Sequence, residues 1–304
     1  MRIGIASHIV LDTLETTEGT SVQSIGGPPV YAGLVCRRFG FDVTLATKVG
    51  ADLPAQARAQ LEKERIPLSP KQIVDAPTTR FAIASDGIHE RRMTLRSKCL
   101  PLTLADIVEV DVDCWLVSPV FDEAPAEVLS AIKSDGGKKQ FVMLDPQGYM
   151  RLAGANGEIS LKDRVEIDLS GIRAIKVDPK EMAALTGGKS GLEGMRDLMS
   201  SGIELVVSTV PNEIHLLHSD IHYWAKIPQT ETPDATGAGD ILAGAFCCAY
   251  LKERDPLWAL CFGAGAVRAA LESGQSGLAK IPRMSSIEEN ASYFYNTIGF
   301  RQLS

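Results

Sequence analysis

The sequence has little of what marks several large classes of protein. Aromatic residues make up only 6% of its 304 residues, and its six cysteines include no Cys-x-x-Cys pair. It has no long run of lysine and arginine, and its formal net charge is −7, which argues against a nucleic-acid partner. Because most of the cysteines lie within apolar runs, we expect reduced, buried thiols and a cytoplasmic protein.

Long apolar runs and targeting segments are also missing. The apolar run from Ile241 to Leu251 is too short to span a bilayer. Residues 1–6 read as a strand rather than as a signal peptide. We find no internal repeat and no low-complexity linker. We therefore expect no contact with a membrane and a single domain over residues 1–304.

Short apolar segments alternate with helical ones along most of the chain. The predicted core strands cover residues 2–8, 43–49, 112–118, 140–145, 172–177 and 203–208. The first predicted helix runs through Ala32, Leu34, Val35 and Phe39 and ends at Gly40. The other predicted helices lie near 54–65, 124–135, 179–186, 190–201, 238–252, 255–273 and 285–296. This order predicts an α/β fold with a central, mostly parallel sheet and helices on both of its faces.

Residues 77–98 break the alternation. Asp86-Gly87 separates two segments rich in β-forming residues, 79–85 and 90–95, and this pattern favours a hairpin. No crossover helix follows, so the hairpin stands off the main sheet. Together with residues 11–24 it forms either a small β-lid or a plain edge hairpin.

The most informative stretch is residues 233–240, Pro-Asp-Ala-Thr-Gly-Ala-Gly-Asp, which leads into the apolar run at 241. Gly237 and Gly239 permit a tight turn. The helix that follows offers unpaired N–H groups and a positive dipole end, which together bind anions. Asp240, in the first helical turn, is either a cap or a base that takes a proton from a hydroxyl attacking a phosphoryl group.

The last seven residues of this stretch resemble the signature D-[TP]-[TV]-G-A-G-D of the ribokinase-like (PfkB) carbohydrate kinases. The resemblance implies a ribokinase-like fold, with a lid formed by about 11–24 and 77–98 that covers the substrate. It implies that Asp240 is the catalytic base and that the amides of Gly237, Ala238 and Gly239 form the anion hole. The resemblance implies ATP and Mg²⁺ as cofactors. It also allows a homodimer formed through the lid.

The resemblance also assigns residues to the substrate. Asp12 matches a substrate-binding carboxylate, and Gly26 and Gly27 match a glycine pair that approaches the substrate. The chain departs from the family at Pro28-Pro29 and at Tyr31, where Asn is usual. Tyr31 has a flat ring with one hydroxyl, which suits stacking on a substrate ring as much as binding the edge of a sugar.

Residues 145–151, Asp-Pro-Gln-Gly-Tyr-Met-Arg, follow a predicted strand. They place Gln147 and Arg151 either toward the substrate or the γ-phosphate, or in a surface turn.

On the donor side, Asp178-Pro179-Lys180-Glu181 resembles the family's N-x-x-E motif, with Asp in place of Asn. The resemblance places Asp178 near the phosphates and lets Glu181 hold Mg²⁺ through water. The same residues also form a near capping box, and both roles are compatible. Ser208 matches the Thr of the nucleotide loop T-x-G-x-x-G, but Val210 and Glu213 replace its glycines.

Late in the chain, small-residue stretches containing Gly265 and Gly274 resemble segments that flank the adenine. By the same resemblance these stretches also flank a monovalent-cation loop that involves Asp234 and Thr236. Thr236 belongs to the nucleotide site as well, and Asp234 is the residue that would hold a cation such as K⁺.

Two rival functions come from other classes. Gly237-x-Gly239-x-x-x-Ala243 is similar to a variant dinucleotide fingerprint, but helix follows helix here instead of the βαβ unit that a dehydrogenase needs. A non-catalytic sugar-binding relative is the second rival, and an assay for product formation separates it from a kinase.

The sequence thus predicts an ATP-dependent kinase that acts on a hydroxyl of a small polyhydroxy substrate. Gly-Gly-Pro-Pro-x-Tyr-Ala together with Asp-Pro-Gln-Gly-Tyr-Met-Arg resembles the inositol-kinase-like branch of the family. The order of expected acceptors is therefore a cyclitol (myo-inositol) first, a nucleoside second, and a simple hexose or pentose third.

Overall fold

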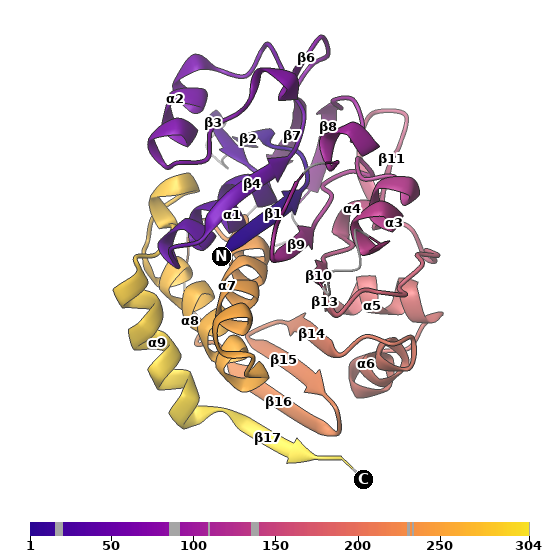
Figure 1. Ribbon diagram of the computed structural model, residues 1–304, viewed down its shortest axis with the longest axis vertical. Helices are drawn as coiled ribbons and strands as arrows, with labels where there is room; N and C mark the ends of the chain where they lie inside the picture. Colours follow the sequence, from indigo (N-terminus) through magenta and orange to yellow (C-terminus); the bar gives the residue numbers. More distant parts are fainter. Residues whose placement is uncertain are drawn as a thin grey trace.

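The computed structural model contains a large central sheet covered by helices on both faces, with a smaller sheet at one end (Figure 1). It describes residues 1–15, 21–84, 92–108, 110–134, 140–229, 232 and 234–303. The predicted hairpin tip at 86–89 and Pro233 lie outside these residues.

The central sheet has the strand order β17-β16-β15-β14-β13-β10-β9-β1-β4. The strands from β14 to β4 in this order run parallel, and β15, β16 and β17 add to the β14 edge in antiparallel fashion. The parallel strands are β1 (Arg2–Ala6), β4 (Asp42–Ala46), β9 (Cys114–Val117), β10 (Phe141–Leu144), β13 (Ala174–Val177) and β14 (Leu205–Val210). The antiparallel strands are β15 (Glu213–His218), β16 (Ile221–Lys226) and β17 (Gly299–Gln302).

Alternating side chains of these strands feed two separate cores, because successive residues of a strand point to opposite faces. In β9, Cys114 and Leu116 belong to one core, whereas Trp115 and Val117 belong to the other. The first core is completed by α1 (Pro28–Arg38), α2 (Ala55–Lys63), α7 (Ala238–Glu253), α8 (Pro256–Glu272) and α9 (Met284–Thr297). The second is completed by α3 (Ala126–Ser134), α5 (Pro179–Thr186) and α6 (Gly191–Ser200).

Helix α7 lies in the middle of the first core, between α1 and α8. Every residue from Asp240 to Leu251 is buried, so the helix is apolar on all sides. A helix enclosed in this way cannot shift without disturbing the core, because packed interiors tolerate little displacement. The packing therefore fixes the position of its N-terminus, where the glycine turn lies.

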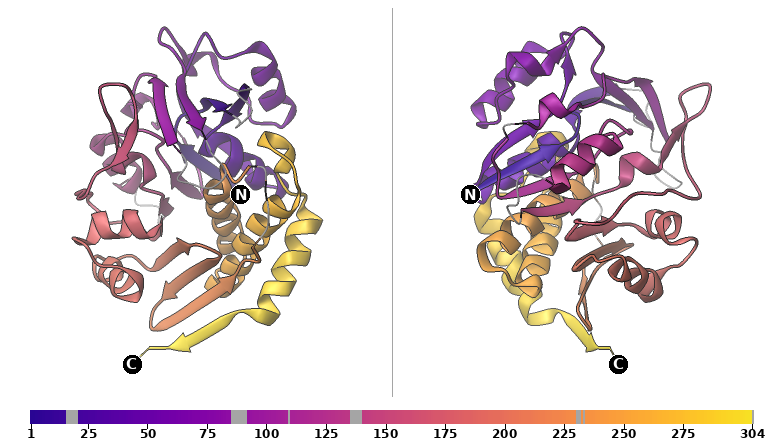
Figure 2. Two further views of the ribbon diagram at one scale, coloured as in Figure 1. Left: turned by 180° about the vertical axis from the view of Figure 1, so that it is seen from behind. Right: turned by 45° about the vertical axis from the view of Figure 1, so that its right-hand side comes forward.

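The smaller sheet has the order β3-β2-β7-β8 and forms a lid at one end of the central sheet (Figure 2). Its strands are β2 (Val10–Glu15), β3 (Ser21–Gly26), β7 (Thr79–Ala84) and β8 (Arg92–Ser97). The last two lie within the expected lid segment 77–98, and the first two extend one and two residues beyond the expected segment 11–24. The amide of Leu95 donates a hydrogen bond of 2.8 Å to the Gly157 carbonyl, next to the hairpin of β11 (Arg151–Ala153) and β12 (Ile159–Leu161). That contact ties the lid to the body.

Several elements were not predicted. The expected strand 43–49 is two elements, β4 and the short β5 (Val49–Gly50), which pairs with β6 (Ile73–Val74). The hairpin β11–β12, the edge strand β17 and the short helix α4 (Gln147–Met150) are too short to leave a periodic signal. The short 3₁₀ helices are η1 (Pro70–Gln72), η2 (Leu104–Asp106) and η4 (Gly277–Lys280). None of the helices described combines the length and the apolar character that crossing a bilayer requires.

Candidate active site

A cavity of about 130 Å³ lies between the lid and the carboxyl ends of the parallel strands. Ligands of open parallel sheets bind at this edge. The lid contributes an acid and several apolar side chains, and the body contributes most of the polar ones. From the lid come Val10, Asp12, Phe81, Ile83 and Met93. From the body come Gly27, Pro28, Tyr31, Val120, Gln147, Arg151, Lys176, Thr236, Gly237, Gly239 and Asp240.

The glycine turn enters this cavity at the start of α7. Gly237 has φ of +76°, in the left-handed region, and α7 begins at the next residue. A Cβ on Gly237 would lie 2.3 Å from the Tyr31 ring, so a side chain is excluded by space as well as by backbone conformation. The turn therefore exposes the first-turn amides of α7, which have no partner within the helix.

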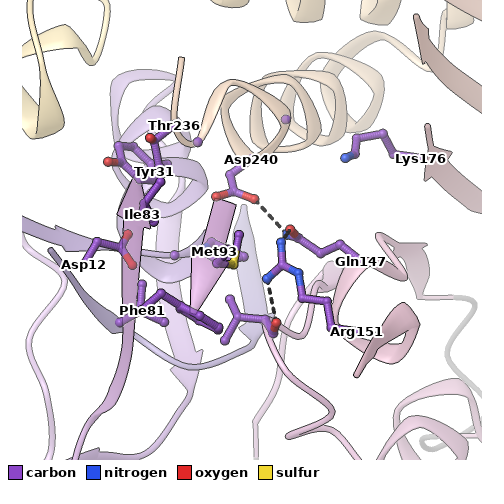
Figure 3. Close-up of a pocket in the computed structure, with 16 residues that line it drawn as sticks. Asp12, Tyr31, Phe81, Ile83, Met93, Gln147, Arg151, Lys176, Thr236 and Asp240 are labelled. Carbon is purple, nitrogen blue, oxygen red and sulfur yellow. Dashed lines mark hydrogen bonds between the residues drawn. The ribbon is translucent and has the colours of Figure 1, made fainter. Parts of the chain in front are cut away.

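Asp240 points from the first turn of α7 into the cavity (Figure 3). The side-chain amide of Gln147 donates to Asp240 Oδ1 at 3.3 Å. Arg151 in turn donates to Gln147 Oε1 at 2.9 Å and to the Val120 carbonyl at 2.6 Å. Arg151 thus fixes the orientation of Gln147, and Gln147 faces Asp240.

The surroundings of Asp240 suit a base that works near neutral pH. Burial raises its pKa, and the carboxylate of Asp145 raises it further. Lys176, Arg151 and the Gln147 hydrogen bond act in the opposite direction but leave the pKa at about 7. General bases are most effective when their pKa lies close to the working pH.

The residues expected on the substrate side come together around the cavity. Asp12 lies in β2 of the lid and is 5% exposed. A Cβ on Gly26 would lie 2.7 Å from Asp12 Oδ2, and Gly27 has φ of +85° where α1 begins. The Tyr31 ring packs against Gly237 and so supports the glycine turn. Tyr31 also lines the cavity, and its contact with a substrate stays a prediction.

Sequence analysis missed a buried ion pair at the anion hole. Lys176 Nζ lies 2.9 Å from Asp145 Oδ2, and both side chains are nearly inaccessible to solvent. A Cβ on Gly239 would lie 3.0 Å from the same Nζ, which places the ammonium beside the glycine turn. One signal existed: Lys176 is a lone charge in the buried strand 174–177, directly before Asp178.

Asp178 and Glu181 form the capping box expected from their spacing. Asp178 Oδ1 accepts from the Glu181 amide at 2.8 Å, and Glu181 Oε2 accepts from the Asp178 amide at 2.8 Å. Burial raises the pKa of Glu181 to about 7, Lys176 lowers it, and Asp145 and Asp178 raise it. Among the described residues no group of three or more His, Cys, Asp or Glu side chains is placed to hold a metal ion. A Mg²⁺ bound here would therefore contact one or two of these carboxylates and keep several waters, as this ion prefers.

A second cavity, of about 470 Å³, lies on the other side of the turn. Its walls are mostly apolar and come from the β14–β15 hairpin, the segment after β16, α7 and α8. They are Thr209, Val210, Asn212, Glu213, Ile214, Ile227, Pro228, Gln229, Ala238, Gly239, Leu242, Val267 and Leu271. Gly239 borders both cavities.

Some of the residues expected near a nucleotide lie elsewhere. Ser208 is buried within β14, and its neighbours Thr209 and Val210 line the second cavity instead. Gly265 packs against α9, where a Cβ would lie 2.7 Å from the Ala291 amide nitrogen, and this packing accounts for the glycine. Gly274 is exposed in the loop after α8, with φ of +64°.

Thr236 lines the first cavity. Asp234 lies four residues before Ala238, where α7 begins, and accepts hydrogen bonds from the amides of Thr236 at 2.8 Å and Gly277 at 3.0 Å. The loop after α8 therefore reaches Asp234 through Gly277 and not through Gly274.

The chain belongs to the pfkB family of carbohydrate kinases, whose model matches residues 3–282. The family consists of phosphotransferases that act on hydroxyl groups, and the chain is therefore a sugar or nucleoside kinase of this kind. It is 24% identical over 257 residues to a cytidine kinase of Thermococcus kodakarensis, and the alignment covers 82% of this chain and 88% of that protein.

Solved structures share the fold. A pyrophosphate-dependent kinase of the ribokinase family, in complex with a pyrophosphate analog and myo-inositol, superposes with a TM-score of 0.79 at 18% identity, over 94% of this chain and 99% of that one. A double mutant of the fructokinase of Vibrio cholerae, with fructose, ADP and a potassium ion bound, gives a TM-score of 0.76 at 19% identity, over 95% of this chain and 98% of that one. These similarities confirm the ribokinase-like α/β fold predicted from the sequence.

Proposed function

We propose that the protein transfers the γ-phosphoryl group of ATP to a ring hydroxyl of a small polyol, with myo-inositol favoured. The observation that carries the proposal is that two cavities meet at Gly239, one holding Asp240 under the lid and the other lined with apolar walls. A phosphoryl group passing between them would lie at the N-terminal end of α7, whose amides and dipole favour negative charge.

In this mechanism the acceptor hydroxyl hydrogen-bonds to Asp240, which takes its proton as the oxygen attacks the phosphoryl group. The bond from phosphorus to the leaving oxygen then breaks, and the proton stays on Asp240. The amides of residues 237–239 and the ammonium of Lys176 stabilise the charge on the transferred group. Gln147 and Arg151 keep the Asp240 carboxylate turned toward the acceptor.

Asp178 and Glu181 are the residues that would hold Mg²⁺, with water completing its coordination. When bound, the ion supplies charge neutralisation between donor phosphates. The protein's own contribution is to fix the carboxylates, which the capping box of α5 does. Lys176 offsets the charge of these acids.

The donor pocket favours ATP over pyrophosphate. Leu242, Val267, Leu271, Ile214 and Ile227 form an apolar surface that suits the faces of a purine base, and pyrophosphate has nothing to place there. Pyrophosphate is the alternative donor, because a structurally similar kinase of the ribokinase family depends on it. Val210 and Glu213, which stand where glycines are usual, are compatible with either donor.

The size and chemistry of the acceptor cavity favour a single small ring. Its volume of about 130 Å³ lies well below the roughly 300–1,000 Å³ of typical pockets for drug-sized ligands. Asp12 and Asp240 can each accept hydrogen bonds from neighbouring hydroxyls, while Phe81, Ile83 and Met93 of the lid can cover the ring's C–H face. A nucleoside is the second candidate, and the similarity to a cytidine kinase supports it.

The direct experiment is an assay of the purified protein with each donor, ATP or pyrophosphate, against inositols, nucleosides and monosaccharides. The proposal expects turnover with ATP and a cyclitol. Turnover of a nucleoside or ribose with no cyclitol turnover would replace the acceptor, and turnover with pyrophosphate alone would replace the donor. ATP bound without any product would favour the non-catalytic relative.

The homodimer through the lid also remains a proposal. Its support is the exposed lid strand β3, where Val22 is 55% exposed. Sedimentation of the wild-type protein beside Val22→Glu tests it: a dimer that the substitution dissociates supports the lid interface.

A further inference from the structure

Lys280 is a fully buried lysine outside the catalytic residues named so far. It lies in η4, is 1% exposed, and its ammonium contacts Asp234 twice. Nζ donates to Asp234 Oδ2 at 2.9 Å and to the Asp234 carbonyl at 3.1 Å. Nζ also lies 5.1 Å from the centre of the Tyr31 ring, within cation–π range.

These contacts join Asp234, which precedes the glycine turn, to η4 and the loop after α8. Asp234 binds Thr236 through one carboxylate oxygen, and Gly277 and Lys280 through the other. The Lys280 ammonium therefore fixes Asp234, at the start of the turn, through both its carboxylate and its backbone carbonyl. The Tyr31 ring, which the ammonium faces, packs on Gly237 within the turn.

We infer that the Lys280 ammonium takes the place of a monovalent metal ion at Asp234, so that phosphoryl transfer by this chain needs no K⁺. The inference rests on the proposed function. It also means that the K⁺ expected at Asp234 from the family resemblance does not fit this chain.

Two physical reasons exclude K⁺ from this place. K⁺ requires oxygen ligands, and the two Asp234 oxygens that it would use already accept from the ammonium. A second cation beside a buried ammonium would also meet strong like-charge repulsion in a low-dielectric interior. Burial works to raise the pKa of Asp234, but the hydrogen bonds from Lys280, Thr236 and Gly277 outweigh it and hold the pKa at about 2, so the carboxylate stays ionised.

The first test uses the wild-type protein, with the phosphoryl-transfer assay run in potassium, sodium or tetramethylammonium chloride at equal ionic strength. We expect the same kcat in all three salts. A kcat that depends on K⁺ overturns the inference. Absence of product in every salt would instead count against the proposed function, so the two failures are distinguishable.

The second test removes the ammonium. Lys280→Ala vacates the site while leaving the Asp234 oxygens in place, and we expect kcat to fall by roughly 10- to 100-fold, the worth of a charge-assisted hydrogen bond. Potassium should then restore much of the loss, whereas Lys280→Met, which fills the space with an uncharged chain, should show no rescue. Lys252→Ala is the matched control, because Lys252 binds the Phe39 carbonyl at 2.9 Å on another part of α7.

A readout without catalysis accompanies these assays. The melting temperature of Lys280→Ala should rise in potassium chloride above its value in tetramethylammonium chloride, while that of the wild type should not change. If Lys280→Ala folds and neither its kcat nor its melting temperature responds to K⁺, the site is not equivalent to a cation site and the inference is wrong. If neither Lys280 variant folds, the wild-type salt comparison still decides the question.

Discussion

Two carboxylates bracket the glycine turn, and their surroundings differ sharply. Asp234, before the turn, is bound by an ammonium and two backbone amides, and its pKa is held at about 2. Asp240, after the turn, is buried near the carboxylate of Asp145, and its pKa is raised to about 7. Burial raises the pKa of both, so the difference comes from the other neighbours: hydrogen-bond donors lower the pKa of Asp234, whereas the Asp145 carboxylate raises that of Asp240 further.

This difference in pKa gives the two carboxylates different roles: Asp234 holds the turn in place, and Asp240 takes part in the chemistry. A carboxylate that keeps its charge at every working pH can hold a turn in place but is a poor acceptor of protons. A carboxylate whose pKa lies near neutral can both accept a proton and release it. The predictions below test this division of roles, beginning with the largest effect.

Asp240→Asn should lower kcat by roughly 10²–10⁴-fold, the usual worth of a positioned general base, with little change in acceptor binding. Turnover is measured under saturating ATP and acceptor. Asp255→Asn is the matched control, because Asp255 caps α8 by accepting from the Trp258 amide at 3.1 Å. If the two variants lose similar activity, Asp240 is only a helix cap.

Asp12→Asn should raise the KM for the acceptor by roughly 10- to 100-fold, the worth of one charged hydrogen bond, with a smaller effect on kcat. The reason is that Asp12 faces the cavity from the lid, whereas the chemistry takes place at α7. Steady-state kinetics separate the two parameters. A loss confined to kcat would place Asp12 in the catalytic step instead.

Glu181→Gln should raise the Mg²⁺ concentration needed for half-maximal activity by roughly 10-fold, in the range seen when a group that orients a metal is lost. The melting temperature should change little, because a Gln side-chain oxygen can still accept from the Asp178 amide. A large fall in melting temperature with an unchanged Mg²⁺ requirement would leave only the capping role.

Asp240→Asn should also stabilise the protein at high pH. The folded pKa of about 7 lies above the ordinary 3.8, so the folded state holds a proton that the unfolded state has lost, and stability falls as pH rises between these values. The stabilisation should therefore be absent near pH 4 and reach at most about 4 kcal/mol above pH 7, since each pKa unit corresponds to about 1.36 kcal/mol. Melting curves of the wild type and Asp240→Asn at pH 5, 6, 7 and 8 measure their difference in stability. A difference that does not change with pH would contradict the raised pKa of Asp240.

The sequence predicted those parts of the fold and site that depend on local pattern. The parallel strands and long helices have a clear alternation of apolar residues, and the glycine turn carries its own chemistry in 234–240. The ion pairs of Lys280 and Lys176 were missed because their partners lie far away in the sequence: Lys280 is 46 residues from Asp234, and Lys176 is 31 from Asp145. The contact of Tyr31 with Gly237 was not predicted because it arises only when α1 and α7 pack together.

The most direct test of the account is the pH dependence of kcat/KM, which reports the ionisations of the free enzyme. We expect activity in the wild type to rise with pH through a limb near pH 7, as Asp240 loses its proton. Glu181 also has a pKa of about 7, so Glu181→Gln is measured alongside and should keep the limb. In Asp240→Asn the low residual rate should show no such limb. A wild-type profile that stays flat down to pH 5, or a limb that persists in Asp240→Asn and disappears in Glu181→Gln, would contradict the assignment of Asp240 as the base.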